Sequence, residues 1–143
     1  AILRMLPRAD LERLIDTALE LDMFVLLEAF DAPDIELAHA LVGARRGRHR
    51  LLLVGVNSRD LVTLKVVPGR LDALAASLPK EVRRVAESGV ATPADAARAA
   101  ACGYDLALVG SALMSAADPQ ALAGAMLADA RAAAQRRGVE ARP

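Results

Sequence analysis

The chain of 143 residues has few aromatic residues, one cysteine and no surplus of either charge. Aromatic residues make up 2% of it, which argues against base-stacking surfaces and carbohydrate clefts, because both need several exposed rings. The single cysteine, Cys102, excludes an intrachain disulfide framework and a multi-cysteine metal site. His39 and His49 lack metal-ligand spacing, so no metal is expected.

Long apolar runs and basic surplus are also missing. No run approaches the ~20 apolar residues of a membrane span, and no secretory signal opens the chain. Lys plus Arg equals Asp plus Glu at 18 each, which argues against a nucleic-acid-coating protein. We interpret the basic stretch Arg45–Arg50 as a solvated loop. A cytoplasmic protein that binds neither nucleic acid nor membrane is therefore expected.

Short apolar runs alternate with amphipathic stretches along the whole chain. Continuous apolar runs are typical of strands buried on both faces of a parallel sheet. The expected strands are Ala1–Leu6, Met23–Ala29, Leu51–Val56, Arg83–Ala86 and Leu106–Val109. The expected helices are Asp10–Leu21, Asp34–Leu41, Pro68–Leu78, Thr92–Cys102 and Asp118–Arg137. This order predicts an α/β domain over residues 1–143 with right-handed crossovers, either an open doubly wound sheet or part of a (βα)8 barrel.

Polar residues follow the second and third expected strands, at the ends where parallel sheets carry function. Glu28 lies in the apolar run Leu26–Ala29, where a carboxylate is costly unless it is paired or functional. We expect it to face a cavity, the alternative being a structural ion pair with an arginine. Asn57 and Arg59 are suited to bind substrate oxygens or a phosphate, although an Asx turn with an Arg59–Asp60 pair explains them equally well.

Two turns rich in small residues follow the last two expected strands. Gly89 comes after Glu87 and Ser88, and Gly110 precedes Ser111. Glycine lets backbone N–H groups approach an anion, and such turns on the last two strands of a barrel commonly hold a phosphate. One glycine alone is more often conformational, but the pair favours a phosphate site. We expect a bulky side chain at Gly110 to block the approach and strain the turn.

Three segments together resemble the indole-3-glycerol-phosphate synthase family: Gly55–Leu61, Val85–Val90 and Leu108–Met114. The runs Val25–Glu28 and Ala1–Leu3 fit the fifth and fourth strands of that family. The resemblance implies a partial TIM barrel, strands 4 to 8, with five of eight units present. It also implies a carboxy-lyase of tryptophan biosynthesis that needs no cofactor and no metal. That reaction closes the indole ring of 1-(2-carboxyphenylamino)-1-deoxyribulose 5-phosphate with loss of CO2 and water.

The resemblance also implies roles for individual residues. Glu28 resembles the general base, Asn57 the amide that positions the substrate, and Arg59 the arginine that orders the same site. Glu87 and Ser88 resemble the polar pair at the end of the seventh strand. The residues that resemble the donors to the substrate phosphate are Gly89, Gly110 and Ser111.

The first three units of the family barrel, which carry the lysine acting as general acid, are missing. Lys65 and Lys80 do not lie at a matching strand end, and ring closure needs an acid. One hypothesis is therefore a portion of the synthase, inactive alone, that self-associates or pairs with a complementary N-terminal barrel fragment. The other is a non-catalytic phosphate-binding or structural βα module. The start at Ala1, inside an apolar run, favours the first.

Overall fold

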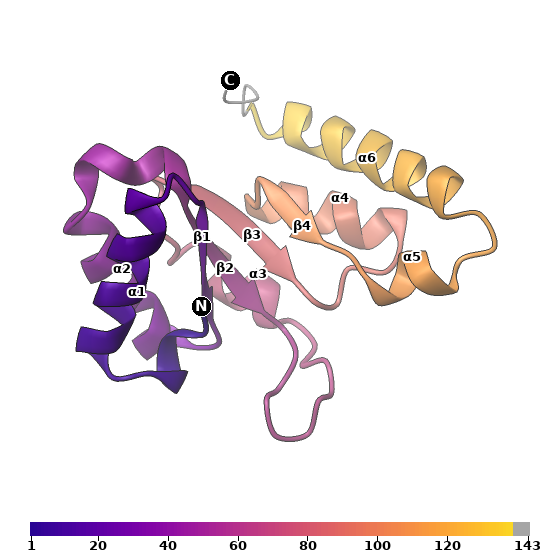
Figure 1. Ribbon diagram of the computed structural model, residues 1–143. Helices are drawn as coiled ribbons and strands as arrows, with labels where there is room; N and C mark the ends of the chain where they lie inside the picture. The colour runs from indigo at the N-terminus through magenta and orange to yellow at the C-terminus, as the bar shows by residue number, and fades with distance from the viewer. Residues whose placement is uncertain (139–143) are drawn as a thin grey trace.

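The computed structural model describes residues 1–138 and contains a four-stranded parallel sheet (Figure 1). The strands are β1 (Val25–Ala29), β2 (Leu52–Asn57), β3 (Arg83–Glu87) and β4 (Leu106–Leu108). Their order in the sheet is β1-β2-β3-β4, so neighbours in space are also neighbours along the chain. A barrel wall is wound in this way, whereas a doubly wound sheet reverses its order at a switch point. The expected α/β fold with parallel barrel-type units is confirmed.

Helices connect and flank these strands on both sides of the picture, with α1 and α2 beside β1 and α4 to α6 beside β4 (Figure 1). The 3-10 helices are η1 (Leu3–Met5) and η2 (Arg46–Leu51). The α-helices are α1 (Arg8–Glu20), α2 (Ala32–Gly43), α3 (Arg70–Ala75), α4 (Pro93–Cys102), α5 (Ser111–Ser115) and α6 (Pro119–Arg136). None of the helices within residues 1–138 combines the length and apolar character that a bilayer crossing requires.

The first expected strand, Ala1–Leu6, is wrong as a strand. Ile2 makes a single parallel bridge with Glu28, and the chain then turns into η1. Arg4, within this run, donates through Nε to Asp34 Oδ2 at 2.9 Å, at the start of α2. The Arg4 side chain binds Asp34 from within η1, and the backbone there is helical rather than extended. The sheet therefore begins with a single bridge at Ile2 instead of a fifth strand.

The predicted start and stop of α4 are confirmed by its caps. The Thr92 side chain accepts from the Asp95 N–H, and Asp95 accepts from the Thr92 N–H, which forms a capping box. The helix ends before Gly103, whose φ of 105° is left-handed. By contrast, the helix expected over Pro68–Leu78 is shorter, because Gly69 precedes α3 at a φ of 75°.

The basic stretch Arg45–Arg50 is largely exposed, as expected, but it is a helical segment held in place rather than a free loop. It contains η2 and is anchored on α1: Arg45 Nε donates to Asp16 Oδ1 at 2.7 Å, and Arg48 Nη1 donates to the Leu19 carbonyl at 2.6 Å. Carbonyls in the last turn of a helix lack intrahelical donors, which explains why an arginine settles there.

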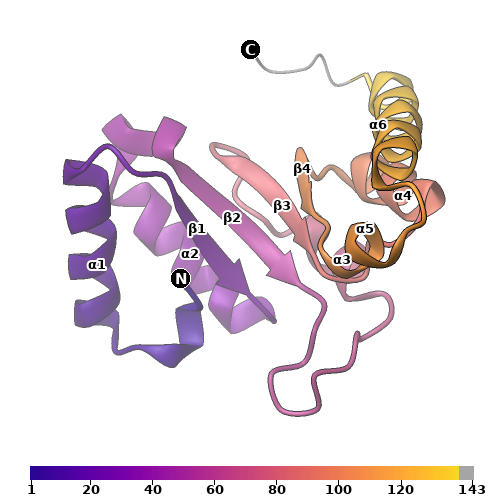
Figure 2. The same ribbon diagram turned by 45° about the vertical axis from the view of Figure 1, so that its right-hand side comes forward.

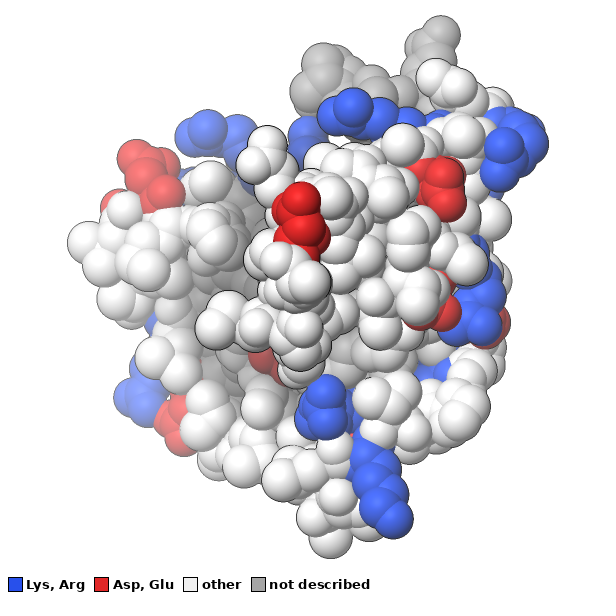
Figure 3. Space-filling model, turned by 90° about the vertical axis from the view of Figure 1, so that its right-hand side faces the viewer, with Lys and Arg blue, Asp and Glu red and all other residues white. Residues whose placement is uncertain are grey.

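Burial differs sharply across the sheet. Leu27 of β1 and Val54 and Val56 of β2 are fully buried, whereas Leu106 and Leu108 of the edge strand β4 are 41% and 53% exposed. The long helix α6 packs along α4 (Figure 2), and an apolar groove runs between α6 and β4. The face on this side of the molecule is largely uncharged (Figure 3). The carboxyl ends of β1, β2 and β3 thus rest on a packed core, and that of β4 does not.

Candidate functional site

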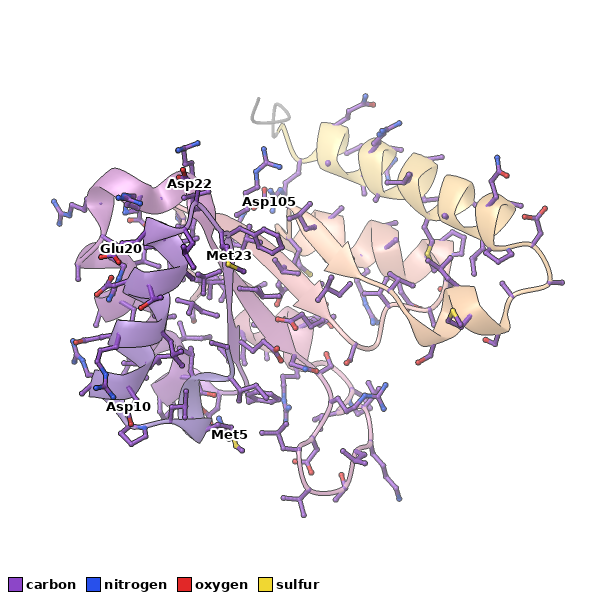
Figure 4. All side chains as sticks on the ribbon, in the orientation of Figure 1. Met5, Asp10, Glu20, Asp22, Met23 and Asp105 are labelled. Carbon is purple, nitrogen blue, oxygen red and sulfur yellow. The ribbon has the colours of Figure 1, made fainter. Side chains whose placement is uncertain are left out.

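Polar side chains from three neighbouring strands meet at one end of the sheet. Asp105 and Met23 mark the amino ends of β4 and β1 in Figure 4, and the loop after β2 extends from the opposite end. At that opposite end, Glu28 stands beside Gly55 in the register, and Asn57 stands beside Glu87. Parallel strands end at the same edge, so these side chains are brought together by the sheet itself.

Asn57 links the first two strands of this site. Its Nδ2 donates to Glu28 Oε2 at 3.1 Å, and its Oδ1 accepts from the Arg59 N–H at 2.9 Å. Both ends of the amide are therefore fixed, which settles its orientation. The partner of Glu28 is an amide rather than an arginine, so the ion-pair alternative for Glu28 does not hold among residues 1–138.

Glu87 is the most buried of the site's charged side chains, at 4% exposed. Burial foremost, then the charge of Glu28 and a hydrogen bond with Glu28, raise its pKa to about 8. Its Oε1 has no hydrogen-bond partner among the described residues. Glu87 therefore keeps its proton at neutral pH, and the sequence pattern gave no sign of such a proton-bearing carboxyl.

The loop after β2 holds the Arg59 guanidinium away from the two carboxyl groups. Arg59 Nη1 donates to the Leu64 carbonyl at 2.7 Å, inside the same loop. The bond from the Arg59 N–H to Asn57 Oδ1 is the Asx turn that the sequence allowed, but no ion pair between Arg59 and Asp60 is present among the described residues. Asp60 instead accepts from the N–H groups of Val62 and Thr63 at 3.0 and 2.7 Å. These backbone bonds also lower the pKa of Asp60. The backbone of Arg59, not its guanidinium, contributes to the cluster of Glu28, Asn57 and Glu87.

The turn after β3 has an unusual backbone. Ser88 and Gly89 have φ values of 60° and 74°, both in the left-handed region. Glycine is favoured there, and a Cβ at Gly89 would also come within 3.2 Å of Val66 Cγ1. Ser88 adopts the same conformation without that freedom, which is a strain typical of functional turns.

The turn after β4 is more open. Gly110 has a φ of −110°, and no atom of the described residues lies within 4 Å of a Cβ built there. The expected strain from a side chain at Gly110 is therefore wrong. No side chain of residues 1–138 caps α5, whereas Asp31, Thr92 and Asp118 cap α2, α4 and α6. The first N–H groups of α5, beginning at Ser111, therefore lack an acceptor among the described side chains, as do those of α1 and α3.

Comparison with known proteins decides the family. Residues 1–126 match the family model described as indole-3-glycerol phosphate synthase. The chain belongs to the indole-3-glycerol phosphate synthase family. An indole-3-glycerol phosphate synthase of Methanothermobacter marburgensis is 44% identical over 83% of this chain and 40% of its own length. Indole-3-glycerol phosphate synthase 1 of Streptomyces coelicolor is 34% identical over 96% of this chain and 48% of its own.

The chain spans less than half the length of these relatives. A solved structure titled as the BexX/CysO complex of Amycolatopsis orientalis has a TM-score of 0.65 over 96% of this chain and 53% of that one. At 22% identity, that likeness shows the fold alone. The family model and the relatives agree with the resemblance that the strand-end motifs indicated.

Sequence reasoning missed one residue that supports the site. Arg70, at the start of α3, donates through Nη1 to the Asn57 carbonyl at 3.1 Å. Ser58 is 2% exposed, and its N–H donates to the Glu87 carbonyl at 2.8 Å. These bonds hold the ends of β2 and β3 together. An arginine thirteen positions after a strand end carries no recognisable signal in the sequence.

Neither lysine stands at the end of a strand. Lys65 is in the projecting loop after β2, and Lys80 precedes β3 on the amino side of the sheet. No group of three or more His, Cys, Asp or Glu side chains in the described part of the chain is placed to hold a metal ion. The chemistry that residues 1–138 offer is therefore that of a carboxyl pair, an amide and two turns rich in small residues.

Proposed function

We propose that this chain supplies the carboxyl-end part of an indole-3-glycerol phosphate synthase active site. In this proposal Glu28 is the general base, Asn57 orients the substrate, and Glu87 and Ser88 form the polar pair beside it. The observation that carries the proposal is the meeting of Glu28, Asn57 and Glu87 at the ends of three neighbouring strands, with the Asn57 amide held at both of its ends.

The pair of carboxyl groups suits proton transfer. The pKa of Glu87 is raised to about 8, so this carboxyl holds a proton at neutral pH, and the neighbouring Glu28 accepts a hydrogen bond from the Asn57 amide. A buried carboxyl group with a raised pKa beside a second carboxyl group is typical of acid–base sites. This supports ring closure of the anilino-deoxyribulose phosphate, with loss of CO2 and water, as the reaction of the assembled site.

The proposal places the substrate phosphate between the last two turns. Because Glu87 pairs with Leu108, the turns that follow β3 and β4 are neighbours. Gly89, Gly110 and Ser111 would present backbone N–H groups there, near the uncapped start of α5. Arg59 would contact the substrate only after its guanidinium leaves the Leu64 carbonyl.

We further propose that the bare edge of β4 is covered in the working protein by complementary barrel units. Leu106 and Leu108 are exposed there, and edges of this kind invite pairing. Those units would also carry the family's general-acid lysine, so this chain alone should release no CO2 from the substrate. Light scattering will distinguish pairing with such units from self-association, and a stable monomer that does not bind them would contradict the proposal.

Amide chemical shifts during a titration with inorganic phosphate test the function. The amides of Gly89, Gly110 and Ser111 should move in the parent chain. Gly110→Val should abolish the movement by blocking access, since the open space at Gly110 lets the variant fold. Gly43→Val, at another open glycine in α2, is the control and should leave the shifts unchanged.

Two outcomes would contradict the proposal. If the amide chemical shifts of the parent do not change with phosphate, or change equally in Gly110→Val, the proposed phosphate site is wrong. Phosphate binding with no response of Glu28, Asn57 or Glu87 to the full substrate would indicate a non-catalytic phosphate-binding module instead.

A further inference from the structure

Gly55 occupies a position where glycine is unexpected. It is buried in the middle of β2, between Glu28 of β1 and Val85 of β3 in the register. Its φ lies outside the left-handed region, so its backbone conformation is open to any residue. Glycine inside a strand weakens it, and often marks close approach by another group. The reason for glycine here is therefore space rather than conformation.

The space is taken by the carboxyl group of Glu87. A Cβ built on Gly55 would lie 2.0 Å from Glu87 Oε1 and 3.0 Å from Glu87 Cδ. Non-bonded atoms do not approach so closely, so a side chain at 55 and the present Glu87 carboxyl exclude each other. Glu87 comes from β3 and reaches across β2, while Glu28 approaches the same residue from β1.

We propose that Gly55 is a positioning residue of the active site: its missing side chain leaves the slot on β2 in which the Glu87 carboxyl lies beside Glu28. The slot accounts for the burial of Glu87 and for its contact with Glu28. It also leaves Oε1 buried and without a hydrogen-bond partner among the described residues, so a substrate amine or hydroxyl could pair with it only after the site opens. The last point rests on the function proposed above, whereas the slot itself does not.

Three variants of the full chain test this inference. Gly55→Ala should push the Glu87 carboxyl away from Glu28 and lower its titration midpoint from about 8 by at least one pH unit. Glu87→Asp shortens the side chain and should make an alanine at 55 tolerable. The double variant should therefore be more stable to urea than Gly55→Ala alone, whereas the same Glu87→Asp change in the parent background should lower stability.

Carbon-detected NMR of the side-chain carboxyl groups follows the Glu87 midpoint. Gly43→Ala is the matched control, because a Cβ at Gly43 meets open space whereas one at Gly55 meets the Glu87 carboxyl. An unchanged Glu87 midpoint in folded Gly55→Ala would overturn the inference. If Gly55→Ala does not fold, recovery of folding in the double variant supports the slot, and failure to recover overturns it. None of these readouts uses substrate. If the Glu87 midpoint shift and the rescue by Glu87→Asp are observed but the chain binds neither phosphate nor substrate, only the proposed function is contradicted.

Discussion

The carboxyl ends of β1 to β3 and the turn between β4 and α5 are built differently, although both belong to the same candidate site. At the first, the Asn57 amide is held at both ends, Glu87 is almost fully buried, and Arg70 and Ser58 fasten the strand ends. At the second, Gly110 faces open space and no side chain of residues 1–138 caps α5. The cluster of Glu28, Asn57 and Glu87 is organised by contacts within this chain, whereas the turn at Gly110, where we propose that the substrate phosphate binds, is open.

The position of each strand in the sheet explains the contrast. β2 has a hydrogen-bonded neighbour on each side, so its end is fixed by two ladders. β4 pairs only with β3 among the described strands, and its three residues are all exposed. Site residues on the buried strands are therefore held in place by their neighbours, whereas those that follow the exposed strand β4 are not.

The largest expected difference is in stability. Leu27→Ala in β1 should lower the free energy of unfolding by about 2–5 kcal/mol, because it opens a cavity at a residue with no exposed surface. Leu108→Ala in β4 should cost less than about 1 kcal/mol, because that leucine is already half exposed. Urea denaturation measures both, and similar losses would mean that β4 is as well packed as β1.

The next largest effect is a pH dependence of the free energy of unfolding that is caused by the buried Glu87 carboxyl. Because folding raises the pKa of Glu87 to about 8, the folded state holds a proton that the unfolded state releases near 4.5. The contribution of Glu87 to stability is full below pH 4.5 and is lost as the pH rises to about 8, on the order of a few kcal/mol at 1.4 kcal/mol per pKa unit.

Glu87→Gln removes the titrating proton, so its stability should fall less than that of the parent between pH 5 and 8. Urea denaturation at a series of pH values follows both proteins. Glu36→Gln, at an exposed position of α2, serves as the control and should keep the slope of the parent. Equal slopes in Glu87→Gln and the parent would show that Glu87 titrates normally.

The smallest effect compares two helix starts. Thr92→Ala breaks the capping box of α4 and should cost about 1 kcal/mol. Ser111→Ala at the start of α5 removes no cap and should change stability by less than about 0.5 kcal/mol. If Ser111→Ala proves as costly in thermal unfolding as Thr92→Ala, then the α5 turn is not open.

Much of this could be predicted from the sequence, because the signals are local. Thr92 and Gly103 delimit α4, because capping depends on a few neighbouring residues. Glu28 and Asn57 indicate strand ends because each interrupts an apolar run. The family motifs gave the barrel order that periodicity left open. Local signals of this kind are enough to predict that Glu28 and Asn57 lie at the carboxyl ends of neighbouring strands.

The rest depends on register and on contacts between distant segments. The strand expected over Ala1–Leu6 fails because Arg4 meets Asp34, thirty positions away. The absence of a side chain at Gly55 is explained by its contact with the Glu87 carboxyl. That contact depends on the register between β2 and β3, which the sequence does not show. Neither a propensity nor a spacing reports which side chains become neighbours across a sheet.

Contacts within the chain itself organise the pair formed by Glu28 and Glu87. The most direct measurement is the titration of the Glu87 side-chain carboxyl in the parent chain, followed by carbon-detected NMR from pH 4 to 10. Burial beside Glu28 predicts a midpoint near 8. A midpoint near the ordinary 4.5 would show that Glu87 is solvated and that β1 to β3 do not hold a preformed acid–base site.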